Sequence, residues 1–199
     1  MAPSPDFAAD RTIFWGFAEP RQGGNATGVA RGTISSDERG LENVKVIHQT
    51  MPAYDRDLHF GSRLAFGPDG PLYVTTGERS DIPMRPQAQQ PNSDLGKVLR
   101  VTRDGAIALD NPYVGQSGAR EAIWSLGHRN IQAAVFNTQG RLWTIEHGTR
   151  GGDELNLIQK GKHYGWPLQA KGKECSGALP IASPAGSARA QVDRMEQPV

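Results

Sequence analysis

The chain has 199 residues, with 22 Lys and Arg against 21 Asp and Glu, so its formal net charge is +1. Because neither sign of charge dominates, we expect no nucleic-acid partner and no attraction to a membrane surface. Hydrophobic residues make up 37%, and the sequence contains 24 glycines and 14 prolines. This composition is typical of a globular chain that turns often, and it favours an all-β fold.

The single cysteine, Cys175, excludes an internal disulfide framework and a multi-cysteine metal site. No run reaches the ~20 apolar residues of a transmembrane helix. The first residues, MAPSPD, lack the basic and apolar regions of a signal peptide. We therefore expect a soluble chain that carries no export signal in this sequence.

The first predicted strands lie between residues 13 and 47. Residues 13–17, 27–34 and 44–47 are rich in β-branched and aromatic side chains, and Gly and Asp bound them. Residues 5–7 predict a turn before the first of these strands, but no strand is visible ahead of that turn. We therefore expect the first sheet to lack a strand and to expose an edge.

The next segment, residues 64–78, is the first clear copy of an internal repeat. It reads LAFGPDGPLYVTTGE and aligns without gaps to AVFNTQGRLWTIEHG at residues 134–148, an offset of 70 residues. Each copy predicts a strand, a tight turn with Gly at its end, and a second strand. A weaker copy lies around residues 5–17.

Between these copies, residues 97–101 and 121–126 predict further strands, and the polar residues 79–94, with three prolines, predict a loop. About four strands per repeat predicts the blades of a β-propeller, here two full blades and a partial one. We expect this partial propeller to occupy residues 1–170, with residues 171–199 as a long loop or disordered tail. We expect its open sheet edges to favour self-association.

Polar residues just before two repeat strands are the first candidates for chemistry. His59 lies five residues before Leu64, and Arg129 lies five residues before Ala134, so both would point toward the rim or the central channel. An imidazole there suits a general base, and a guanidinium suits an anionic or carbonyl oxygen. The alternatives are a histidine that hydrogen-bonds its own turn and an ion pair between blades.

The densest charged stretch, EHGTRGGDE at residues 146–154, follows a predicted strand and contains three glycines. Glycines let backbone carbonyl groups approach a hard cation such as Ca²⁺. The alternative is a glycine-rich turn stabilised by side chains. The HExxH, P-loop, GxGxxG and GxSxG patterns are absent, so zincin, NTPase, Rossmann and α/β-hydrolase functions have no support.

Six segments, taken together and in this order, resemble the soluble aldose sugar dehydrogenases that use pyrroloquinoline quinone (PQQ), the glucose/sorbosone dehydrogenase family. They are HFGSRL (59–64), GKVLR (96–100), DNP (110–112), IWSLGHRN (123–130), EHG with GGDE (146–154) and KGKHYGWP (160–167). The likeness extends over about residues 4–168. Departures from the family pattern stand at Ser62, Ile131, Ala133 and Thr149, where relatives often have glycine or proline.

The resemblance implies a six-bladed β-propeller, of which this chain is about half. It implies an oxidoreductase that converts the anomeric hydroxyl of aldose sugars to lactones, with PQQ as hydride acceptor and Ca²⁺ beside it. The electron acceptor that follows PQQ is unknown. The resemblance also implies a periplasmic or secreted location. The alternative is a non-catalytic propeller fragment or ligand-binding module that is inactive without further blades.

By position, the resemblance implies a role for each of six residues. His59 would be the general base, and Glu78 would be the carboxylate that orients it. Arg129 and Asn130 would contact the PQQ oxygens. The backbone carbonyl groups of Gly148 and Thr149 would bind the Ca²⁺.

Overall fold

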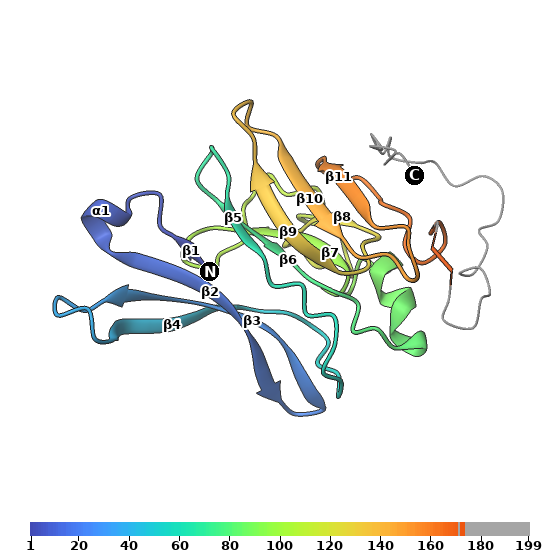
Figure 1. The fold of residues 1–199 in the computed structure, drawn as a ribbon, viewed down its shortest axis with the longest axis horizontal. Helices are drawn as coiled ribbons and strands as arrows, with labels where there is room; N and C mark the ends of the chain where they lie inside the picture. The colour runs from blue at the N-terminus through green and yellow to red at the C-terminus, as the bar shows by residue number, and fades with distance from the viewer. Residues whose placement is uncertain (171, 174–199) are drawn as a thin grey trace.

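The computed structural model describes residues 1–170 and 172–173, and these form three antiparallel sheets that follow one another along the chain (Figure 1). The first sheet contains β1 (Ala2–Pro3), β2 (Thr12–Arg21), β3 (Gly24–Ile34) and β4 (Leu41–Gln49). The second contains β5 (Leu64–Phe66), β6 (Leu72–Thr75), β7 (Lys97–Val101) and β8 (Ile123–Leu126). The third contains β9 (Ile131–Phe136), β10 (Leu142–Glu146) and β11 (Glu154–Ile158).

Within each sheet, strands that are consecutive in sequence are neighbours in space, so every sheet is a meander. The first strand of the second sheet, β5, contacts the first strands of the other two sheets, β1 and β9. This arrangement confirms the all-β, partial-propeller expectation, because blades meet through their first strands around a common axis. It also brings the loops that precede β5 and β9 close together.

The repeat is confirmed at the level of single hydrogen bonds. In the first copy the Gly67 N–H donates to the Pro71 carbonyl at 2.9 Å, and in the second the Asn137 N–H donates to the Arg141 carbonyl at 3.0 Å. The turns end at Gly70 with φ +99° and at Gly140 with φ +71°. Both angles lie in the left-handed region, which glycine enters at little cost.

Two expectations are corrected. The strand ahead of the first turn exists, because Ala2 and Pro3 of β1 pair with Phe14 and Ile13 of β2. It escaped detection because two residues cannot show an alternating pattern. The first sheet therefore has four strands, and the sheet with three strands among the described residues is the third one.

The second correction concerns residues 79–94, which were expected to be a loop. They contain a 3₁₀ helix, η1 (Ile82–Gln89), whose N-cap side chain Asp81 accepts the Ile82 N–H at 3.0 Å. The only other helix in the described part of the chain is α1 (Phe7–Asp10). Proline suits the first turn of η1, since N–H groups there have no intrahelical partner.

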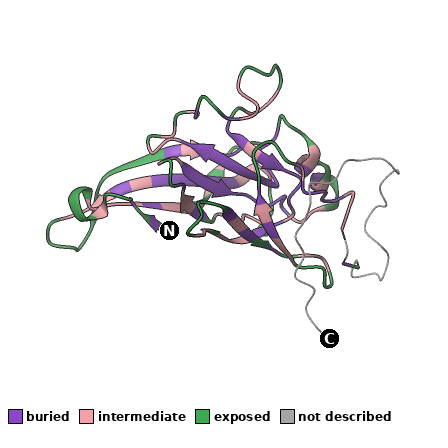
Figure 2. Cartoon of the chain, turned by 90° about the horizontal axis from the view of Figure 1, so that it is seen from above, coloured by how far each residue is buried: buried purple, intermediate pink, exposed green. Residues whose placement is uncertain are grey.

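Apolar side chains fill the space between neighbouring sheets, so most strands are buried, whereas β4 and the hairpin turns are largely exposed (Figure 2). Phe14 and Phe66 pack edge-to-face at 5.0 Å between the first two sheets. Tyr73 of the second sheet packs edge-to-face on Trp124 of the same sheet and on Phe136 of the third sheet. The helices of residues 1–170 and 172–173 are too short and polar to span a bilayer. Apart from Gly172 and Lys173, the expected tail at 171–199 lies outside the described residues.

Candidate active site

A histidine and a buried carboxylate face each other where the loop before β5 meets the loop after β6. The Nδ1 atom of His59 lies 2.8 Å from Oε1 of Glu78, whose side chain is 0% exposed, while that of His59 is 13% exposed. The second oxygen of Glu78 accepts the Ser80 N–H at 3.0 Å. Because a carboxylate faces Nδ1, this nitrogen carries the proton, and Nε2 is left as a proton acceptor.

The backbone around this pair is unusual. Seven non-glycine residues of the described chain have positive φ, and four of them lie in these two loops: His59 at +52°, Ser62 at +71°, Arg79 at +72° and Ser80 at +61°. Such conformations cost free energy and persist only where surrounding contacts impose them. The angle at Ser62 also explains why a glycine suits this position.

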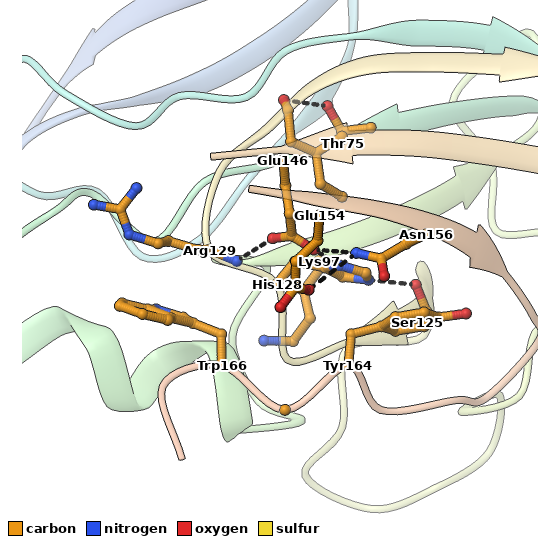
Figure 3. Close-up of polar contacts among 12 residues, drawn as sticks. Thr75, Lys97, Ser125, His128, Arg129, Glu146, Glu154, Asn156, Tyr164 and Trp166 are labelled. Carbon is orange, nitrogen blue, oxygen red and sulfur yellow. Dashed lines mark hydrogen bonds and ion pairs between the residues drawn. The ribbon is translucent and has the colours of Figure 1, made fainter. Parts of the chain in front are cut away.

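The loop between β8 and β9 places Arg129 beside the pair. Its carbonyl accepts the Glu78 N–H at 3.0 Å, and its own N–H donates to Oε2 of Glu146 at 2.6 Å. The guanidinium donates to the His147 carbonyl at 3.1 Å and lies 5.2 Å from the ring of Trp166 (Figure 3). These contacts fix the loop although Ile131 and Ala133 depart from the family pattern.

Asn130 is buried and connects the loop before β5 to the loop after β10. Its Oδ1 accepts the Gly61 N–H at 3.2 Å, and its carbonyl accepts the His147 N–H at 3.2 Å. Its side-chain oxygen is therefore engaged within the protein. The contact between Asn130 and PQQ stays a prediction.

Gly148 shares a pocket with Arg129, so a residue expected at the metal lies beside one expected at the cofactor. A Cβ at Gly148 would collide with the Gly151 carbonyl oxygen and lie 2.6 Å from that of Gly152, so this loop is folded tightly enough to gather carbonyl oxygens. The buried Thr149 Oγ1 has no hydrogen-bond partner within the described residues. Oxygen donors of this kind fit Ca²⁺.

Side-chain clusters of three or more His, Cys, Asp or Glu that could hold a metal ion do not occur within residues 1–170 and 172–173. A metal ion in the Gly148 loop would therefore depend on backbone carbonyls. The ligand roles of Gly148 and Thr149 stay predictions.

The family model for glucose/sorbosone dehydrogenases matches residues 1–199. The chain belongs to this family. It is 42% identical over 176 residues to the aldose sugar dehydrogenase YliI of Escherichia coli, covering 87% of this chain and 47% of that protein. It is 35% identical over 169 residues to quinoprotein glucose dehydrogenase B of Acinetobacter calcoaceticus, covering 77% and 34%.

Solved structures of glucose/sorbosone dehydrogenase type agree with this membership. The apo aldose sugar dehydrogenase of E. coli superposes with a TM-score of 0.87 at 39% identity, covering 94% of this chain and 55% of the other. The PQQ-bound aldose sugar dehydrogenase of Streptomyces coelicolor gives a TM-score of 0.73 at 31% identity, covering 93% and 51%. The chain spans about half the length of the curated relatives it matches.

In this member of the family, sequence reasoning gave no role to a buried group next to Arg129. Glu146, at the end of β10, accepts Nδ1 of His128 at 3.0 Å and Nδ2 of Asn156 at 2.8 Å, besides the Arg129 N–H (Figure 3). Nε2 of His128 also forms a hydrogen bond with the Ser125 hydroxyl at 2.9 Å, and its ring stacks on that of Tyr164 with centroids 4.5 Å apart. The signal for Glu146 in the sequence was a charged residue at the end of an otherwise apolar strand.

Lys97 was also missed as an individual residue. Its buried ammonium donates to the carbonyl groups of Gln87, Ala88 and Leu95 at 2.8, 3.1 and 2.7 Å, and so ties η1 to β7. Burial lowers the pKa of Lys97 to about 7, because desolvation disfavours the charged form, while Asp94 acts in the opposite direction.

Proposed function

We propose that this chain carries the catalytic part of a PQQ-dependent aldose dehydrogenase, which oxidises the anomeric hydroxyl of an aldose to a lactone. The observation that carries the proposal is the 2.8 Å contact between His59 and the buried Glu78. A hydrogen bond from the Glu78 N–H connects this pair to Arg129, which lines a pocket with Gly148. Relatives named aldose sugar dehydrogenase and a PQQ-bound neighbour support the substrate class and the cofactor.

The proton and the hydride leave the sugar by separate routes. Nε2 of His59 takes the proton of the C1 hydroxyl, because its Nδ1 is held by Glu78. Glu78 then stabilises the imidazolium that forms. When bound, PQQ supplies the acceptor for the hydride that leaves C1, so the sugar loses two electrons and two protons in forming the lactone.

The remaining expected residues would bind the cofactor and the metal ion and would polarise the cofactor oxygens. Arg129 would place its positive charge against the cofactor oxygens, where negative charge develops. Asn130 would contact the same oxygens. The carbonyl groups of Gly148 and Thr149 would hold Ca²⁺, whose charge acts on the same oxygens.

A second candidate is favoured by one observation, namely that the chain spans about half the length of its relatives. In this case the chain is a propeller fragment or ligand-binding module that binds PQQ or a sugar without turnover. A periplasmic or secreted location belongs to the proposal only through the family resemblance. Sugar-dependent reduction separates the two candidates.

The experiment is reconstitution of the purified chain with PQQ and Ca²⁺, followed by sugar-dependent reduction of an artificial dye. We expect His59→Ala to lower the rate at least about 100-fold, since it removes the general base. Thr144→Val is the matched control, because Thr144 is buried in β10 away from the pair and its hydroxyl has no partner within the described residues. Equal rates for His59→Ala and Thr144→Val would contradict the proposal.

A further inference from the structure

The Glu146 carboxylate accepts hydrogen bonds from three donors: a backbone N–H, an imidazole and a side-chain amide. Oε2 accepts the backbone N–H of Arg129 at 2.6 Å, while Oε1 accepts Nδ1 of His128 at 3.0 Å and Nδ2 of Asn156 at 2.8 Å. All three partners converge on it in Figure 3. A buried carboxylate is tolerated only with such bonds, so each donor is fixed in direction by the same group.

The contacts continue from Glu146 to the proposed base. The Arg129 residue that donates to Glu146 also accepts the Glu78 N–H at 3.0 Å, and Glu78 contacts His59 at 2.8 Å. On the far side, Asn156 of β11 anchors Glu146 within the third sheet. Hydrogen bonds therefore run from the third sheet through the Arg129 backbone to His59 in the loop before the second sheet.

His128 fixes the same loop from the other direction. Its ring is fully buried, stacks on Tyr164 and forms hydrogen bonds with Glu146 and Ser125. Its backbone N–H donates to the Gly96 carbonyl at 3.1 Å. The residue just before Arg129 is thus immobilised by its side chain and its backbone. The Arg129 side chain extends from this fixed segment and lines the pocket.

We propose that Glu146 is a positioning residue of the active site. Through the Arg129 N–H it sets the distance between the Arg129 guanidinium and the His59–Glu78 pair. The effect of Glu146 on catalysis rests on the proposed function, whereas its effect on the Arg129 loop can be measured in the protein without cofactor. Glutamine at this position keeps the size but offers only one acceptor oxygen to three donors, so Glu146→Gln separates positioning from packing.

The first test is hydrogen exchange of backbone amides in the purified chain. In Glu146→Gln we expect exchange at the Arg129 and Glu78 amides to rise about 10-fold, while the amides of β10 and β11 stay unchanged. Thr144→Val is the control from the same strand and should leave both loops unchanged. Unchanged exchange at Arg129 and Glu78, or a rise shared by the whole third sheet, would overturn the proposal.

If Glu146→Gln does not fold, Asn156→Ala tests the same contacts from the anchoring side. This variant removes one of the three donors to Glu146 and leaves the Arg129 N–H in place. We expect a smaller rise, about 3-fold, at the Arg129 amide. No rise at this amide would contradict the positioning role.

The second test measures PQQ affinity in a double-mutant cycle. We expect Glu146→Gln to weaken binding about 10-fold in the wild-type background and less than about 2-fold in Arg129→Ala, since Glu146 acts through Arg129. Equal losses in both backgrounds would mean a general structural effect and would overturn the inference. If the wild-type chain binds no PQQ, the proposed function fails, and the exchange measurement still decides the role of Glu146.

Discussion

Two buried carboxylates, Glu78 and Glu146, hold the groups of the candidate site in different ways. Glu78 accepts one backbone N–H and one imidazole, and that imidazole is partly exposed. Glu146 also accepts a backbone N–H and an imidazole, but its histidine, His128, is fully buried and closed off by Ser125. Of these two histidines, His59 is therefore the one whose second ring nitrogen a substrate hydroxyl can reach.

This difference predicts the behaviour of Glu78→Gln. An amide does not hold Nδ1–H as a carboxylate does and cannot stabilise the imidazolium, so we expect kcat to fall about 100-fold or more with little change in KM. Steady-state kinetics of the reconstituted chain measure this. Glu121→Gln is a matched control, because Glu121 accepts the Gly115 N–H at 3.0 Å outside the site; an equal fall in both variants would refute the role of Glu78.

Lys97 predicts a pH-dependent stability. The folded chain loses the Lys97 proton at a pKa of about 7, whereas the unfolded chain keeps it up to the ordinary lysine pKa of 10.5. Between these values the unfolded state binds more protons, so the free energy of unfolding should rise as the pH increases from about 7 to about 10.5.

Denaturant unfolding at several pH values tests this linkage with Lys97→Met. The variant has no titrating group at this position, so its stability should rise less steeply with pH than that of the wild type over the same interval. Its absolute stability should be lower, because the carbonyl groups of Gln87, Ala88 and Leu95 lose their donor. Parallel pH profiles would show that Lys97 keeps an ordinary pKa.

At the scale of elements, the loop after β6 packs at Gly77 against the loop before β5, which carries His59. A Cβ at this position would collide with the His59 carbonyl and lie 2.8 Å from Oδ1 of Asn130. We expect Gly77→Ala to cost about 1–3 kcal/mol of stability and to lower activity, because the backbone must shift at the His59 loop. Thermal unfolding and the dye assay measure the two effects.

Gly40→Ala is the control for this substitution. The nearest atom to a Cβ there, Oγ of Ser35, is 4.0 Å away, so the change should alter stability by less than about 1 kcal/mol. If both alanine variants unfold at the same temperature, close packing at Gly77 does not hold the two loops together.

The elements that local pattern determines were predictable from the sequence. The repeat at residues 64–78 and 134–148 predicted both hairpins, because strand alternation and a glycine at positive φ are local requirements. The two residues of β1 gave no pattern, and the prolines of η1 concealed a short 3₁₀ helix. These elements depend on partners elsewhere in the chain.

The same distinction holds within the site. His59 was a candidate from its position before a repeat strand, Glu78 was identified through family resemblance, and the structure brings them together. The contact between Glu146 and the Arg129 N–H was not predictable, because it depends on strand register, including the irregularity between Ile145 and Glu146. Tertiary geometry, rather than residue type, makes Glu146 part of the site.

At the scale of the whole molecule, β4 is an edge strand of the first sheet, and it exposes Leu41, Val44 and Val46. Unpaired strand edges with apolar side chains favour association with other strands. We expect concentration-dependent self-association in sedimentation experiments, and a reduction of it in Val44→Lys. Leu109→Lys, at an exposed position outside the strands, should leave the association unchanged; an equal effect of both would exclude β4 as the contact.

In the proposed reaction, His59 takes a proton from an aldose while a hydride leaves C1 of the same sugar. Its most direct measurement is single-turnover reduction of protein-bound PQQ by an aldose carrying hydrogen or deuterium at C1. We predict sugar-dependent reduction that is slower with deuterium and is abolished in His59→Ala. Bound PQQ that no aldose reduces would contradict the proposed reaction, and reduction at the same rate in His59→Ala would contradict the role of His59 as its base.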